Sequence, residues 1–192
     1  MIAAKDVSTD EQSETWRPEL PGYSTDILPF YRWLSERIPK GGTFLEVGVA
    51  FGRSLAFMAE LRPDVRITGV DPFVLKAEWC GQHAHVITKY GSHAEAFKLL
   101  AAAHAPELAQ ANIVTGTFRD LPASPLDAIF IDGQHTYEEV HGDIKQALSL
   151  VKPGGILAGH DYEPGYPGVM RAVNELLGTP ERHGRTCWWV QR

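Results

Sequence analysis

The apolar residues of the chain follow two spacings. Between Asp26 and Ile38 they recur every three or four residues, which predicts an amphipathic helix that ends at the Pro39-Lys-Gly-Gly42 segment. Short apolar runs are typical of buried strands, and they occupy residues 43–48, 66–70, 112–115, 126–131, 155–158 and 185–191.

Further helices are predicted over residues 54–61 and 167–177 and after the capping residues Ser92 and Thr136. Each of these two hydroxyl residues is followed three positions later by a glutamate, the arrangement of a capping box. The buried stripe of the helix after Thr136 is predicted to be Val140, Ile144, Leu148 and Val151. Residues 72–91 are predicted to be irregular.

This alternation of strands and helices predicts an α/β fold with a doubly wound, mostly parallel sheet, helices on both faces and a short C-terminal antiparallel strand. In such sheets a ligand binds beyond the C-terminal ends of the strands. The residues that follow each strand are therefore the candidates for function.

Composition favours one domain. The chain has 192 residues, 44% hydrophobic and 22% charged, as in an ordinary globular protein. Residues 1–20 carry five acids and two bases without a periodic pattern, and we expect a mobile N-terminal tail or a segment that orders over a ligand. Residues 21–192 form the predicted domain.

Charge and cysteine content limit the partners. The net charge of −6 argues against a nucleic-acid partner. No apolar run approaches the roughly 18 residues of a membrane span, and the polar N-terminus does not resemble a signal peptide. Cys80 and Cys187 do not form a CxxC motif, so a cytoplasmic location is expected.

A glycine loop follows the strand at 43–48. Its sequence, Glu46-Val-Gly48-Val-Ala-Phe-Gly52-Arg-Ser54, lies between a strand and a helix, where glycines permit a tight turn and the helix N-terminus favours an anionic group. The GxxxG spacing and Glu46 favour a cationic ligand over the pyrophosphate of a dinucleotide, although a plain tight turn remains the alternative.

An acid follows the next strand. Asp71 lies 23 residues after Gly48, one βαβ step along the chain, where a carboxylate accepts hydrogen bonds from ribose hydroxyls. A helix cap is the alternative role for Asp71.

Carboxylates and imidazoles follow two later strands. Asp132 and His135 come after residues 126–131, and His160 and Asp161 come after residues 155–158. Their convergence in one crevice predicts a divalent metal site with a base beside it, whereas a solvated or core imidazole is the alternative for each histidine.

Four segments together resemble class I S-adenosylmethionine-dependent methyltransferases. These segments are FLEVGVAFGRS, VDPF, IFIDGQHTYEEVHGDI and LVKPGGILAGHDY. More narrowly, they resemble the methyltransferase domain 24 branch, related to metal-dependent sugar and catechol O-methyltransferases. The resemblance covers about residues 25–190 and implies a Rossmann-like sheet.

The resemblance also implies roles for individual residues. Those implied to bind the cofactor S-adenosylmethionine are Glu46, Gly48, Gly52 and Ser54 at its methionine half, Asp71 at the ribose, and Thr117, Phe118 and Arg119 along the adenine. Those implied to hold the metal are Asp132, His160 and Asp161. His135 matches the general base and Asp132 is the second catalytic residue. His160 stands where the family often has a carboxylate, so Mn, Fe or Zn becomes as suitable as Mg, unless His160 does not ligate.

The implied reaction is metal-dependent O-methylation of a small hydroxylated acceptor such as a sugar, polyketide or catechol. In it a metal lowers the pKa of the acceptor hydroxyl and His135 removes the proton. Two alternatives stay open: a related fold that binds S-adenosylmethionine without methyl transfer, and an NAD-linked oxidoreductase. A homodimer is also left open.

Overall fold

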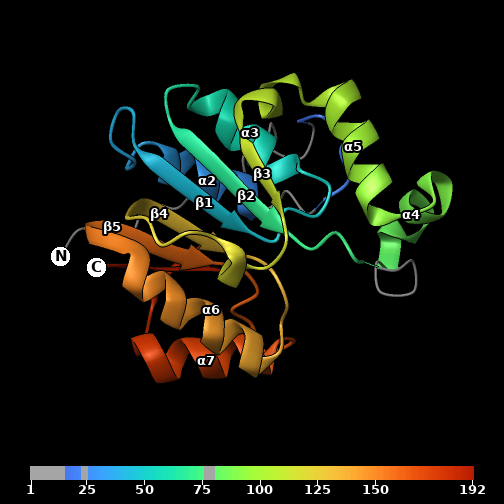
Figure 1. The fold of residues 1–192 in the computed structure, drawn as a ribbon. Helices are drawn as coiled ribbons and strands as arrows, with labels where there is room; N and C mark the ends of the chain where they lie inside the picture. Colours follow the sequence, from blue (N-terminus) through green and yellow to red (C-terminus); the bar gives the residue numbers. More distant parts are fainter. Residues whose placement is uncertain (1–15, 23–25, 76–80) are drawn as a thin grey trace.

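The computed structural model describes residues 16–22, 26–75 and 81–192 and contains a seven-stranded sheet (Figure 1). Its strands are β1 (Thr43–Val47), β2 (Arg66–Asp71), β3 (Asn112–Thr115), β4 (Leu126–Ile131), β5 (Val151–Gly159), β6 (Glu181–His183) and β7 (Cys187–Gln191). Their order across the sheet is β3-β2-β1-β4-β5-β7-β6.

Strand direction confirms the predicted sheet. The neighbours from β3 to β5 pair in parallel, whereas β7 is antiparallel to both β5 and β6. The chain order reverses between β1 and β4, and the C-terminal ends of these strands therefore flank the usual ligand crevice of an open α/β sheet.

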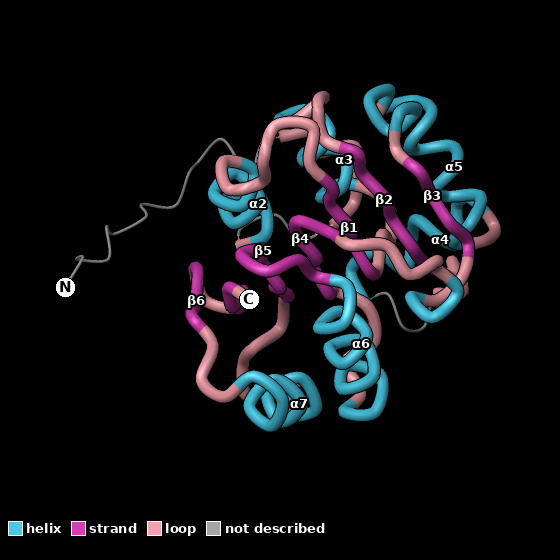
Figure 2. The backbone as a smooth tube through the Cα atoms, turned by 60° about the vertical axis from the view of Figure 1, so that its left-hand side comes forward, coloured by secondary structure: helices cyan, strands magenta, loops and turns pink. Residues whose placement is uncertain are grey.

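Helices cover both faces of the sheet (Figures 1 and 2). They are α2 (Ile27–Ser35), α3 (Arg53–Leu61), α4 (Ala84–Tyr90), α5 (His93–His104), α6 (Tyr137–Leu150) and α7 (Pro167–Leu177). Helices α6 and α7 pack with side chains of one face, such as Leu45 and Ile129, and α2 to α5 pack with side chains of the other, such as Phe44 and Phe130. Because successive strand residues point to opposite faces, the sheet supplies both cores.

Residues 72–91 depart from the prediction of an irregular stretch. Within the described part of this stretch, a 3₁₀ turn over Gly81–His83 leads into α4, which buries Val86 and Ile87. The helix is only seven residues long, too short to show a periodic pattern. Gly91, at φ 83°, ends it.

The C-terminal strands also differ from the prediction. Residues 181–191 form a hairpin of β6 and β7 rather than one strand, and Glu181-Arg-His183 has no apolar pattern that would reveal β6. Strand β5 begins at Val151, upstream of the predicted 155, through a register irregularity at Lys152-Pro-Gly-Gly155 opposite Leu126–Ala128.

The end of the predicted tail packs on the domain. Leu20 is fully buried, Trp16 lies edge-on to Phe57 with ring centroids 5.0 Å apart, and Arg17 forms ion pairs with Glu60 and Glu107. Residues 1–15 lie outside the described residues, so the mobility of that part stays a prediction. Across the described ranges, no helix has the length and apolar character needed to cross a membrane.

Candidate cofactor and metal site

A cavity of about 560 Å³ lies beyond the C-terminal ends of the five parallel strands. One residue at or just after each strand end lines it: Gly48, Asp71, Gly116, Asp132 and His160. The residues that the sequence places after separate strands therefore share one cavity.

The glycine loop is shaped by close contacts between strand ends. Gly48 has φ 93°, and a Cβ atom there would lie 2.1 Å from the backbone oxygen of Asp132. Gly52, at φ 86°, is the N-cap residue of α3, and a Cβ atom there would lie 3.0 Å from the Phe97 ring. Gly48 lines the cavity, whereas Gly52 does not belong to its lining. Both glycines thus have a structural role, and Gly48 also borders the ligand space.

Ser54 connects the cavity to a buried acid. Ser54 lines the cavity, and its hydroxyl donates to Glu46 Oε1 over 2.5 Å. Glu46 itself is fully buried behind Ser54, outside the lining, and its Oε2 atom has no hydrogen-bond partner among the described residues. Burial raises the pKa of Glu46 to about 8, although the Ser54 hydroxyl opposes this shift. Glu46 therefore acts on the cavity through Ser54 rather than by direct contact.

Asp71 holds the loops around it. Its Oδ2 atom accepts from the Ala50 N–H over 2.9 Å, and its Oδ1 atom accepts from the Phe73 N–H over 2.6 Å. Ala50 and Phe73 have φ values of 49° and 51°, a region that side chains other than glycine rarely adopt. Asp71 lines the cavity and keeps further lone pairs on each oxygen, so loop support and ribose binding are compatible.

The three residues Thr117, Phe118 and Arg119 after β3 have different environments. Thr117 and Phe118 line the cavity, although Phe118 is 99% buried and packs in the core on the α6 side. The Arg119 side chain is 61% exposed, lies outside the lining and pairs with Glu139 at 3.6 Å. Of the three predicted adenine residues, the structure places two at the cavity.

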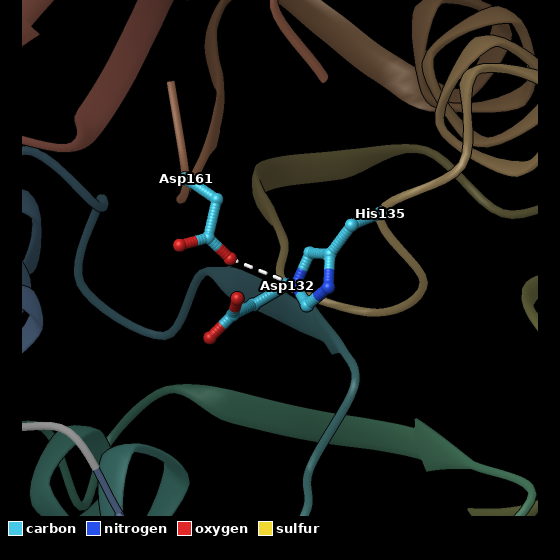
Figure 3. A group of neighbouring side chains, drawn as sticks. All are labelled: Asp132, His135 and Asp161. Atoms are coloured by element: carbon cyan, nitrogen blue, oxygen red, sulfur yellow. Dashed lines mark ion pairs between the residues drawn. The ribbon is translucent and has the colours of Figure 1, made fainter. Parts of the chain in front are cut away.

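Three side chains that could hold a metal ion lie close together in the cavity (Figure 3). Asp132 follows β4, His135 lies in the loop before α6, and Asp161 follows β5, and one ligand atom of each lies within 4.8 Å of the others. His135 Nε2 lies 2.7 Å from Asp161 Oδ2, and this contact raises the pKa of His135. Asp161 has φ 59°, an uncommon conformation that turns the chain sharply after β5.

His160 lies behind this group. Its Nδ1 atom is 3.2 Å from Asp161 Oδ1 and 3.5 Å from Asp132 Oδ1, and its Nε2 atom is 2.7 Å from Thr186 Oγ1. Burial alone would lower the pKa of His160, but the two carboxylates raise it to about 10. The protonated ring then donates at both nitrogens.

Two carboxylates and an imidazole suit a divalent cation. Asp132, Asp161 and His135 fit such an ion, and so does His160 through Nδ1, since Nε2–H can donate to Thr186 as ligating histidines commonly do through their second nitrogen. The donor set is therefore consistent with Mg, Mn, Fe or Zn.

Sequence reasoning missed polar residues that line the cavity from α6. Asp143 and Glu139 line it beside Thr117 and Phe118. An acid at 143 is visible in the sequence, because it falls directly before Ile144 of the predicted buried stripe. Tyr166 also lines the cavity, with its ring centroid 4.7 Å from that of His135.

The glycine loop, the acid after β2 and the strand order are those of a class I methyltransferase fold. The chain matches the methyltransferase domain 24 family over residues 45–162 and belongs to it. The predicted family is thereby confirmed.

Individual relatives are distant. An uncharacterised protein of Acanthamoeba polyphaga mimivirus is 26% identical over 137 residues, which cover 70% of this chain, and the chain spans 59% of that relative's length. The O-methyltransferase NovP has a TM-score of 0.63 at 19% identity, with 93% of this chain and 88% of NovP covered.

Two further solved structures share the fold. TomG, an O-methyltransferase of Streptomyces achromogenes solved with S-adenosylmethionine, has a TM-score of 0.59 at 17% identity, with 95% of this chain and 89% of TomG covered. A putative rRNA methylase of Clostridium thermocellum also has a TM-score of 0.59, at 14% identity, with 89% and 99% covered. These likenesses establish the fold, which serves acceptors of different kinds.

Proposed function

We propose that this chain transfers a methyl group from S-adenosylmethionine to a hydroxyl oxygen of a small acceptor, with a divalent ion at the carboxylate end of the cavity. The main support for this proposal is that a single cavity is lined both by the glycine loop and Asp71 and by Asp132, His135 and Asp161. A cofactor and an acceptor hydroxyl bound in this cavity would be neighbours.

The part of the cavity lined by Gly48, Ser54 and Asp71 suits the cofactor. Gly48 leaves room for close approach, Ser54 offers a hydroxyl, and Asp71 offers lone pairs to a ribose diol. When bound, S-adenosylmethionine supplies an electrophilic methyl group on a sulfonium centre. The chain contributes orientation and exclusion of water, which are large parts of catalysis when two reactants must meet in line.

The part of the cavity lined by Asp132, His135, His160 and Asp161 suits an acceptor hydroxyl. We assign the ion to Asp132, Asp161 and His160 Nδ1, where it would supply the Lewis acidity that lowers a hydroxyl pKa. We assign proton removal to His135, whose side chain is 44% exposed at the cavity and therefore within reach of an acceptor. One nitrogen cannot both coordinate an ion and accept a proton, so these two assignments are exclusive for His135 Nε2.

The acceptor is proposed to be small and hydroxylated. The net charge of −6 disfavours a nucleic acid, and Tyr166 beside His135 offers an aromatic surface for a sugar or a ring.

The test combines binding with turnover. Calorimetry with S-adenosylhomocysteine and with Mn²⁺ measures both ligands without knowledge of the acceptor. Release of S-adenosylhomocysteine is then followed over catechols, polyols and nucleotide sugars, with Mg²⁺, Mn²⁺, Fe²⁺ or Zn²⁺ or with excess chelator. We expect turnover to need the ion, and Asp132→Asn to abolish turnover while sparing cofactor binding.

His135→Gln and His160→Gln separate the two histidine roles. We expect His160→Gln to weaken Mn²⁺ binding and His135→Gln to leave it unchanged while turnover falls about 10²–10⁴-fold. Full turnover in chelator would overturn the metal assignment, and absence of cofactor binding would overturn the proposal as a whole.

A further inference from the structure

Asp143 is a buried carboxylate that faces the cavity without a partner. It lies in the second turn of α6, is only 9% exposed and lines the cavity beside Gly116, Thr117 and Phe118. Among the described residues, no side chain or backbone group forms a hydrogen bond or an ion pair with it. Its carboxylate oxygens are not among the polar atoms closed off from solvent, so the carboxylate is accessible from the cavity and can accept a hydrogen bond from a ligand there.

The neighbouring polar groups are already engaged. The N–H and hydroxyl of Thr117 both donate to Asp120, and the side chain of Gln146 donates to the Phe118 carbonyl over 2.8 Å. These bonds fix the turn after β3 against α6. In this part of the cavity, the polar groups of Thr117 and Gln146 already have partners, whereas the Asp143 carboxylate can still accept a hydrogen bond from a ligand.

Electrostatics point the same way. Burial raises the pKa of Asp143 to about 6, and the nearby charge of Glu139 adds to this shift, whereas Arg119 opposes it. Arg119 pairs with Glu139 at 3.6 Å and is mostly exposed, so its charge only partly offsets the burial of Asp143. The site therefore calls for an incoming hydrogen-bond donor rather than an anion.

We propose that Asp143 reads the base of the cofactor by accepting a hydrogen bond from the exocyclic amine of adenine. This inference rests on the proposed binding of S-adenosylmethionine in this cavity. The family resemblance implies that the adenine lies along Thr117 and Phe118, and Asp143 lines the cavity beside these residues. The amine is the hydrogen-bond donor on the edge of adenine, whereas hypoxanthine presents a carbonyl oxygen at the same place, which a carboxylate repels.

The experiment compares S-adenosylhomocysteine with S-inosylhomocysteine by calorimetry at pH 8, where Asp143 is ionised. We expect the unmodified chain to favour the adenosyl compound by about tenfold or more, the usual worth of a hydrogen bond to a charged group. We expect Asp143→Asn to bring the two affinities within about threefold, because an amide can donate to the inosyl oxygen as well as accept.

Glu138→Gln is the matched control. Glu138 lies in the first turn of the same helix but is exposed and outside the cavity lining, so its removal should keep the discrimination of the unmodified chain. If Asp143→Asn does not fold, the same comparison on the unmodified chain at pH 5 tests the role, because Asp143, with a pKa of about 6, is then protonated and should no longer favour the adenosyl compound.

Each remaining outcome is decisive. Equal affinity of the unmodified chain for both compounds overturns the role of Asp143 and leaves the proposed function intact. Discrimination that persists in Asp143→Asn assigns it to other groups and also overturns the role. Absence of binding to either compound overturns the proposed function and this inference together.

Discussion

The Nε2 atom of His160 and the hydroxyl oxygen of Thr186 lie 2.7 Å apart. The same hydroxyl donates to Asp26 Oδ2 over 2.8 Å, so Thr186 accepts from the ring and cannot turn away. This arrangement directs His160 Nδ1 toward Asp132 and Asp161. A residue of the C-terminal hairpin and a residue before α2 together orient a side chain at the end of β5.

Thr186→Val should therefore weaken the proposed metal site. Removal of the hydroxyl releases the ring of His160 and leaves Asp26 without this donor, while the shape of the side chain is nearly kept. We expect affinity for Mn²⁺ to fall about 10–100-fold, as is usual when the group that orients a ligating histidine is lost. Thr186→Ser should bind as the unmodified chain does. Calorimetry with Mn²⁺ on both variants checks this, and equal affinity for Val and Ser would refute it.

Gly48→Ala should damage the fold more than the cavity. Its Cβ atom would lie 2.1 Å from the Asp132 carbonyl, and alanine at φ 93° is strained in addition. We expect a loss of about 3 kcal/mol or more in the free energy of unfolding. Gly133→Ala is the control, because its Cβ atom would meet its nearest neighbour at 3.7 Å, an ordinary contact. Urea denaturation of both variants gives the comparison, and similar midpoints would contradict it.

Asp71→Asn should reduce both loop stability and cofactor affinity. An amide has one oxygen, so it cannot accept from the N–H groups of both Ala50 and Phe73. We expect each effect to be about 1–3 kcal/mol. The ribose role is isolated with the 2′-deoxy analogue of S-adenosylhomocysteine: it should bind more weakly than the parent compound to the unmodified chain and almost equally to Asp71→Asn. Equal discrimination by both chains would reduce Asp71 to loop support.

Glu46→Gln should stabilise the cofactor-free chain at alkaline pH. The pKa of Glu46 is 4.5 in the unfolded reference and about 8 in the fold, so the folded state binds an additional proton between these values. Stability from this group is complete below pH 4.5 and is lost as the pH rises to 8. The variant should exceed the unmodified chain by up to about 5 kcal/mol at pH 8 and should match it at pH 4.5. Denaturation at both pH values measures the difference, and a constant offset would refute the shift.

The mostly parallel sheet and the edge at which the candidate site lies were accessible from the sequence. Apolar runs followed by Gly48, Asp71, Asp132 and His160 define strand ends, and parallel strands bring those ends to one edge of the sheet. Short stretches of sequence are enough to locate these strand ends, because each strand and the residue after it are adjacent in the chain.

Contacts between distant segments were not accessible in this way. The position of Glu46 behind Ser54 depends on a hydrogen bond between a residue of α3 and a residue of β1. The exposed Arg119 side chain pairs with Glu139 of α6, which lies 20 residues away in the sequence. The partners of His160 come from residues 26 and 186, which no local spacing links to β5. Asp143 could have been flagged as an acid beside a buried stripe, but only the fold shows that it borders the cavity.

The C-terminal hairpin also sets the order in which the protein can mature during synthesis. Strands β1 to β4 and their helices can assemble the glycine loop and Asp71 while the ribosome is still adding residues. Thr186 and β7 follow the five parallel strands along the chain, and β7 must pair with β5 before the ring of His160 is held. A nascent chain would therefore complete its cofactor pocket before β7 is made, and its histidine-supported carboxylate site only after β7 has emerged.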